Sequence, residues 1–191
     1  MTTMVTERRT TRGVLMALRP DLYYRSVTDI DLEDLEARGV CGLLIDLDNT
    51  LVPRNTVTAS QAVMQWLGRA RGRGFRICIV SNNWHERVSD AAESLGVPIV
   101  GKSLKPFPGG FRRGLALLGV TPSQAAVIGD QVFTDVLGGS IAGAITILVK
   151  PLAGGSDLPH TRLLRALERR VLSDRVPLGA GEPSVKAGGV K

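Results

Sequence analysis

An unbroken apolar run that ends in two acids constrains the fold of this chain more than any other feature. Leu43, Leu44 and Ile45 form the run, and Asp46 and Asp48 follow it. Continuous apolar residues are typical of a parallel strand that helices cover on both faces, which predicts an α/β fold. Ligands of such sheets bind at the carboxyl ends of the strands, where these acids lie.

The two residues after the second acid, Asn49 and Thr50, favour a turn. The acids themselves also fit a turn or a helix cap, which is a common use of Asp and Asn after a strand. Further motifs are therefore needed to favour a catalytic interpretation over a structural one.

Hydrophobic periodicity predicts alternating helices and strands along most of the chain. We expect a parallel, Rossmann-like sheet of about five strands in a three-layer arrangement, with helices on both faces. The expected strands are 43–45, 76–80, 97–100, 125–128 and 144–149, and the expected helices are 31–38, 60–71, 84–95, 110–118 and 160–172.

Length and composition fit one domain. The chain has 191 residues, of which 43% are hydrophobic. We expect the domain over residues 19–172, a disordered basic segment over 1–18 and a flexible tail over 173–191. No apolar run approaches the roughly 18 residues that cross a bilayer, and no secretory signal is visible, so we expect a cytoplasmic location.

Polar side chains follow two further predicted strands. Ser81 and Asn82 come directly after strand 76–80, and Asp130 and Asp135 come after strand 125–128. Between these groups, Lys105 stands before a proline that leads into a predicted helix. Parallel strands bring their carboxyl ends to one edge, so these groups are expected to meet there.

These groups occur in an order that resembles the four motifs of the haloacid dehalogenase (HAD) superfamily. Steps of 35, 24 and 25 residues separate Asp46, Ser81, Lys105 and Asp130. The resemblance covers residues 19–172 and narrows to YqeG-type subclass IIIA phosphatases, relatives of phosphatidylglycerophosphate phosphatases. The segments that carry it are Arg19-Pro20-Asp21, Asp46-Leu47-Asp48-Asn49-Thr50, Ser81-Asn82-Asn83, Lys105-Pro106, Gly129-Asp130-Gln131 and Thr134-Asp135-Val136-Leu137-Gly138-Gly139.

The resemblance implies a Mg²⁺-dependent phosphomonoester hydrolase that works through an aspartyl-phosphate. Asp46 would be the nucleophile and Asp48 the general acid and base, with Lys105 steadying the negative charge. Ser81 and Asn82, together with Lys105, would bind the phosphoryl group. Asp46 and Asp130, with the Asp48 carbonyl, would hold Mg²⁺, and Asp135 would orient the metal shell.

Lys102 competes with Lys105 for the lysine role. It belongs to the stretch 96–103, which fits the phosphate-loop pattern G-x-x-x-x-G-K-[ST]. That loop must follow a strand and open a helix, whereas here its middle residues are themselves the predicted strand. We therefore interpret the pattern as a chance match and prefer Lys105.

The spacing of the motifs leaves no room for a cap domain between them. An uncapped site does not close around a small ligand, which favours a bulky phosphate ester such as phosphatidylglycerophosphate. The rival hypothesis is a catalytically weak HAD-fold module that binds RNA or a protein partner, supported by the net charge of +6. No specific nucleic-acid contact is expected, because the excess arginine lies near the chain ends.

Contact with the inner face of an anionic membrane is a further hypothesis. The predicted helix 160–172 has leucines along one side and four arginines elsewhere. Such a helix either meets anionic lipid or packs its leucines on the sheet with its charges in water. No sequence feature specifies an oligomeric state.

Overall fold

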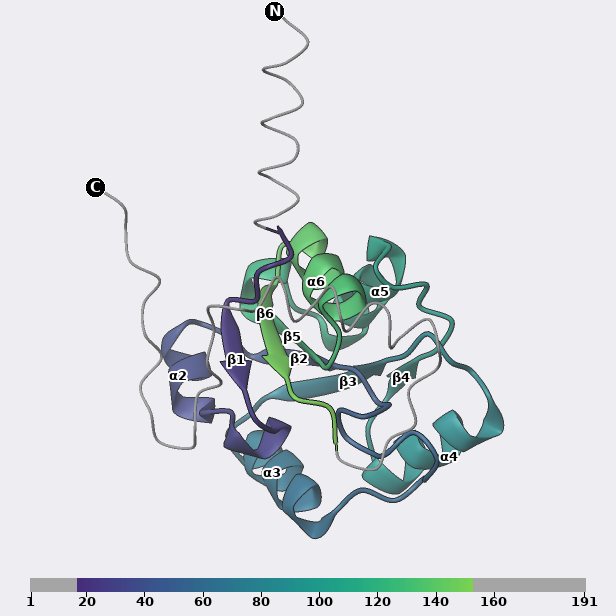
Figure 1. Ribbon diagram of the computed structural model, residues 1–191. Coiled ribbons are helices and arrows are strands. Elements are labelled where there is room, and N and C mark those ends of the chain that lie inside the picture. The colour runs from purple at the N-terminus through teal and green to yellow at the C-terminus, as the bar shows by residue number, and fades with distance from the viewer. Residues whose placement is uncertain (1–16, 153–191) are drawn as a thin grey trace, which may run out of the picture.

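The computed structural model describes residues 17–152, which form a six-stranded sheet with helices on both faces (Figure 1). All strand pairs are parallel, in the order β1-β6-β5-β2-β3-β4. The strands are β1 (Leu22–Tyr24), β2 (Gly42–Ile45), β3 (Arg76–Val80), β4 (Ile99–Val100), β5 (Ala125–Gly129) and β6 (Ile145–Val149). The α/β fold predicted from the sequence is confirmed.

The helices divide between the two faces of the sheet. They are α2 (Leu32–Ala37), α3 (Gln61–Gly72), α4 (Glu86–Leu95), α5 (Pro108–Leu118) and α6 (Leu137–Ala142), with the single turns η1 (Val27–Asp29) and η2 (Pro122–Gln124) and the π-helical turn η3 (Val132–Val136). Leu43 and Ile45 of β2 belong to the same apolar core as α2, α3 and α4, whereas Leu44 packs in a second core with α5. This alternation follows from the period of two in a strand.

The structure differs from the sequence prediction at three places. Helix α6 and the turn η3 before it were not expected, because Gly138 and Gly139 are weak helix formers and give no helical pattern. The sheet has six strands instead of five, because residues 22–24 form an edge strand that pairs with β6. Three residues are fewer than the four to eight by which a strand is recognised in a sequence. Leu18, which the sequence placed in the disordered segment, is 7% exposed and packs with Val132, Val136 and Leu148. The helix 160–172 and the tail lie outside the described residues.

The connections between the motif-bearing strands are short. Between β2 and β3 the chain forms a loop and α3, and between β3 and β4 it forms a loop and α4. Within residues 17–152, no helix has the length and hydropathy that a membrane span requires. Because these strands are parallel, the carboxyl ends of β2, β3, β4 and β5 lie at one edge of the sheet. The loops that carry the predicted site begin there.

Candidate active site

The turn after β2 holds the first motif in a fixed conformation. The Asp46 N–H donates to the Ile128 carbonyl at 2.8 Å, which extends the ladder between β2 and β5. Asn49 then adopts a left-handed φ of 62°, a conformation that Asn tolerates better than most residues. The Asn49 N–H donates to the Val52 carbonyl at 2.7 Å. The turn predicted from the sequence therefore exists and is closed by its own backbone.

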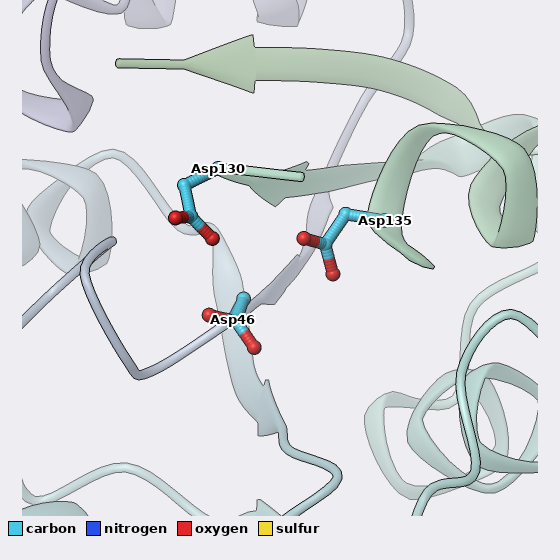
Figure 2. Close-up of side chains that lie close together, drawn as sticks. All are labelled: Asp46, Asp130 and Asp135. Atoms are coloured by element: carbon cyan, nitrogen blue, oxygen red, sulfur yellow. The ribbon is translucent and has the colours of Figure 1, made fainter. Parts of the chain in front are cut away.

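Three carboxylates converge beside this turn and form what we call the acid cluster: Asp46, Asp130 and Asp135 (Figure 2). One oxygen from each lies within 4.8 Å of the others. Asp46 is 9% exposed, Asp130 2% and Asp135 1%. The three come from the ends of β2 and β5 and from the turn η3. Carboxylates that are buried this close together need compensating positive charge.

Asp135 reaches the cluster because the chain returns on itself after β5. Its Oδ2 accepts from the Gln131 N–H and from the Thr134 hydroxyl, both at 3.2 Å. A Cβ on Gly129 would lie 2.2 Å from the Asp135 Cγ, so only glycine permits this approach. The sequence predicted Asp135 outside the ligand set, whereas the structure places its carboxylate among the acids that could hold a metal.

Lys105 supplies the positive charge that the acid cluster contacts directly. Its Nζ lies 2.5 Å from Asp46 Oδ1 and 2.7 Å from Asp135 Oδ1, and its side chain is buried. Lys102 points elsewhere and lies over the Trp84 ring, with Nζ 4.8 Å from the ring centroid. Of the two competing lysines, Lys105 is therefore the one beside Asp46.

The loop that carries Lys105, residues 101–107, is attached to the end of β3 by Asn82. Asn82 Oδ1 accepts from the Lys105 N–H at 2.6 Å and from the Ser103 hydroxyl at 2.8 Å, and Nδ2 donates to the Lys105 carbonyl at 3.2 Å. The Ser103 N–H donates to the Ser81 carbonyl at 3.0 Å. Asn82 thus positions the lysine loop in this structure, while its predicted contact with phosphate stays a prediction.

The electrostatics of the site follow from burying several acids around one cation. Burial raises the pKa of Asp46, Lys105 acts against this rise, and the charges of Asp135 and Asp130 add to it. For Lys105, burial alone lowers the pKa, but Asp135 and Asp46 raise it above its ordinary value. The ammonium therefore stays charged at neutral pH.

Asp48 is nearly buried and lies in a second network. Its Oδ2 accepts from Asn83 Nδ2 at 2.6 Å, and its Oδ1 pairs with the guanidinium of Arg87. Arg87, in the first turn of α4, also donates to the Thr56 carbonyl at 2.8 Å. The sequence analysis assigned no role to Asn83 or Arg87. Asn83 belongs to the segment Ser81-Asn82-Asn83, but no sequence pattern pairs Asn83 or Arg87 with Asp48, since the contacts depend on the pairing of β2 with β3.

Ser81 directly follows β3 and is buried, with 2% of the residue exposed. Its Oγ accepts from the Asn83 N–H at 3.1 Å, and a hydroxyl that accepts can also donate its own proton. Ser81 therefore has the chemistry that the sequence predicted, an O–H donor at the carboxyl edge. Its contact with a phosphoryl oxygen remains a prediction.

The donor set fits a hard divalent cation. The buried space holds three acids but one ammonium, so acidic groups outnumber cations among the described residues of the site. Magnesium prefers carboxylate oxygens completed by water and phosphate oxygens, and its double charge would balance this excess. The acid cluster therefore meets the requirements of the Mg²⁺ site expected from the sequence.

Comparisons with known proteins agree with this geometry. A HAD-hydrolase-like family model matches residues 104–158. The probable phosphatase YqeG of Bacillus subtilis (strain 168) is 40% identical over 154 residues, which are 81% of this chain and 89% of that protein.

Two more distant relatives are eukaryotic proteins. The chloroplastic and mitochondrial phosphatidylglycerophosphate phosphatase 1 of Arabidopsis thaliana is 25% identical over 162 residues, 80% of this chain but 47% of that protein. The chloroplastic protein of the same name from Chlamydomonas reinhardtii is 25% identical over 174 residues, 86% of this chain and 65% of that protein. This chain thus spans less than two thirds of either protein.

The match to YqeG covers most of both chains, and the predicted motif residues Asp46, Lys105 and Asp130 meet at one sheet edge. Both observations confirm the resemblance drawn from the sequence. The chain therefore belongs to the HAD superfamily, in the phosphatase family that includes YqeG.

Proposed function

We propose that the protein is a Mg²⁺-dependent phosphomonoester hydrolase that works through an aspartyl-phosphate on Asp46. The observation that carries the proposal is the buried contact of Lys105 with both Asp46 and Asp135, at 2.5 and 2.7 Å. A structural ion pair needs one acid for one base. Here a single cation serves two acids of a three-acid cluster, an arrangement typical of sites that bind a further positive ion and an anionic substrate.

Asp46 would attack the phosphorus atom, forming an oxygen–phosphorus bond as the bond to the leaving oxygen breaks. Lys105 holds one Asp46 oxygen and reduces the repulsion between the carboxylate and the phosphoryl oxygens. The Ser81 hydroxyl donates to those oxygens, whose negative charge persists in a loose transition state. Asp46, Asp130 and the Asp48 carbonyl, with Asp135 beside them, would hold Mg²⁺, which supplies further charge neutralisation when bound.

Asp48 is the proposed general acid and base. It would give a proton to the leaving oxygen and then take one from the water that cleaves the aspartyl-phosphate. Asn83 and Arg87 hold both of its carboxylate oxygens, so its orientation is fixed before a substrate arrives. Preorganisation of this kind lowers the cost of reaching the reactive geometry.

Bulky phosphate esters are the proposed substrate class, with phosphatidylglycerophosphate as the lead candidate. Two relatives carry that name, and the connections that follow β2 and β3 hold one helix each rather than a covering domain. A substrate that covers the site with its own bulk would exclude water where a capped enzyme uses its cap.

The test is hydrolysis of a soluble aryl phosphate and of phosphatidylglycerophosphate in mixed micelles, beside nucleotides and sugar phosphates. The wild type should release phosphate with Mg²⁺ and stop with EDTA. Asp46→Asn should lower kcat at least about a thousandfold, because an amide is a poor nucleophile. Full activity in Asp46→Asn would contradict the nucleophile assignment.

The rival hypothesis is a binding module with weak catalysis, and beryllium fluoride separates the two. With Mg²⁺ it mimics a phosphoryl group on an Asp, so the wild type should bind it and Asp46→Asn should not. A wild type that neither binds it nor releases phosphate would favour the binding module.

A further inference from the structure

The three most exposed large apolar side chains among residues 17–152 all lie on the loops of the candidate site. Phe107 is 71% exposed, Leu104 68% and Trp84 56%. We call these three residues the rim. Trp84 follows the Ser81-Asn82-Asn83 segment after β3, and Leu104 and Phe107 flank Lys105 in the loop after β4. The rim thus belongs to the same two loops that carry Ser81 and Lys105.

These two loops lie side by side. A Cβ on Gly101 would be 3.6 Å from the Trp84 Cβ, and Lys102 Nζ lies 4.8 Å from the centroid of the Trp84 ring. The Phe107 N–H donates to the Leu104 carbonyl at 3.0 Å, so both residues belong to one turn. The rim residues therefore come from two adjacent loops of the carboxyl edge, and Lys102 places a cation on the tryptophan.

Folding stability does not account for two of the three rim residues. Leu104 adopts a left-handed φ of 56°, which disfavours a leucine and favours Asn or Gly. Phe107 occupies the N-cap of α5 and makes no side-chain cap hydrogen bond, where Ser or Asp would stabilise the helix. Apolar residues that are exposed and locally unfavourable are expected where function requires them.

We infer that the rim docks the protein on the surface of an anionic phospholipid bilayer, so that a phosphate ester headgroup enters the site from the membrane. The inference rests on the proposed phosphatase function. Trp and Phe favour the boundary between headgroups and acyl chains, and Lys102 adds attraction to lipid phosphates. The net charge of +6, much of it near the chain ends, attracts the whole molecule to an anionic surface without selecting the rim.

The exposure of the rim favours a bilayer as its occupant over a protein pocket of matching shape. Its side chains project from loops and are more than half exposed, so they fit a fluid apolar layer that needs no matching shape. This surface differs from the helix 160–172 that the sequence indicated, which lies outside the described residues.

Tryptophan fluorescence gives a direct test, because the chain has two tryptophans with opposite environments. Trp66 is 0% exposed and its Nε1 donates to the Ile30 carbonyl, whereas Trp84 is exposed. Vesicles containing phosphatidylglycerol should shift the emission of the wild type to shorter wavelength. Trp84→Phe should abolish the shift while keeping an apolar ring. No shift in the wild type would overturn the inference.

Co-sedimentation with the same vesicles locates the surface. The double variant Leu104→Asn/Phe107→Ser suits the local backbone at both positions and should fold normally. We expect its partition to the vesicles to fall about tenfold or more. Leu117→Gln is the matched control, since Leu117 is 55% exposed but lies at the far end of α5, and it should bind like the wild type.

Activity assays separate a failure of docking from a failure of the proposed function. The double variant should hydrolyse soluble aryl phosphate like the wild type and lose rate only on vesicle substrate. Vesicle binding by the double variant at the wild-type level would overturn the inference, whatever the activity. Vesicle binding that depends on the rim, in a protein without phosphatase activity, would retain the docking surface and overturn the proposed function.

Discussion

At the scale of single residues, the contacts of Asp48 show what a motif leaves out. Asn83 and Arg87, which hold its carboxylate, lie 35 and 39 residues away along the chain. They reach it only because β2 and β3 are neighbours in the sheet. The positioning of the proposed general acid therefore depends on two side chains to which the sequence assigned no role.

Replacing Arg87 should test this positioning. Arg87→Gln removes the charge beside Asp48, and we expect kcat on aryl phosphate to fall about 10- to 100-fold with little change in KM. A matched control is Arg112→Gln, because Arg112 is exposed on α5. Steady-state kinetics check both variants. An unchanged kcat in Arg87→Gln would show that Asp48 needs no such support.

Gly129 provides a second test at this scale. An alanine there would place its Cβ 2.2 Å from the Asp135 Cγ, so Asp135 must leave the acid cluster. We expect Gly129→Ala to lose activity and to lower the free energy of unfolding by about 1 to 3 kcal/mol. Gly109→Ala is the control, because its Cβ would meet nothing within 4 Å. Activity assays and denaturant titration measure the two effects; wild-type values in Gly129→Ala would contradict the packing argument.

Sequence predicted much of the site, and the remainder depends on three-dimensional packing. Asp46, Lys105 and Asp130 follow from motif order because each closes a strand or opens a helix. Asp135 within the cluster does not follow, since it requires the π-helical turn η3 and the close approach over Gly129. Such turns are rare and recur at functional sites, and they have no simple periodic signature.

At the scale of elements, the long helices agree with their predicted ranges and the short elements differ. The apolar spacing of Val63, Trp66, Leu67 and Ala70 predicts α3 within one residue at each end. β1 has three residues, too few to give a pattern, and β4 has only two of the four residues predicted as strand 97–100. In these strands, pairing with a longer neighbour determines the structure, and a single sequence does not show that pairing.

Helix α3 permits a paired stability test with opposite signs. Gly68 is exposed in its interior, and a Cβ there would meet nothing within 4 Å. Gly68→Ala should therefore stabilise the protein by about 0.5 to 1 kcal/mol. Ser60 caps the helix by accepting from the Val63 N–H at 3.3 Å, so Ser60→Ala should destabilise it by about 1 kcal/mol. Urea titration measures both; a less stable Gly68→Ala would contradict the description of α3.

At the scale of the whole molecule, the sheet order gathers loops from distant parts of the chain at one edge. β2 lies between β5 and β3, so Asp46 has Asp130 on one side and Ser81 on the other. The acid cluster therefore joins the ends of two neighbouring strands, β2 and β5, and the turn η3. The stability of the fold should depend on whether an ion neutralises these acids.

Metal should therefore stabilise the fold. An ion that binds only the folded state raises the free energy of unfolding by about 2.7 kcal/mol when its concentration is one hundred times its dissociation constant. For a chain of this size we expect Mg²⁺ at that level to raise Tm by roughly 5 to 10 °C, and EDTA to reverse the rise. Differential scanning fluorimetry measures the shift. Asp130→Asn should reduce it strongly, and an equal shift in that variant would remove Asp130 from the ligand set.

The shared lysine has an evolutionary consequence. Losing Lys105 alone would leave Asp46 and Asp135 buried without the cation that contacts both, at a cost of about 3 to 5 kcal/mol. That cost is a large part of the stability of an ordinary domain. A descendant that abandoned catalysis for a purely binding role would have to replace the lysine and an acid together. Inactive members of the lineage should therefore be recognisable by paired substitutions at positions 105 and 46 or 135.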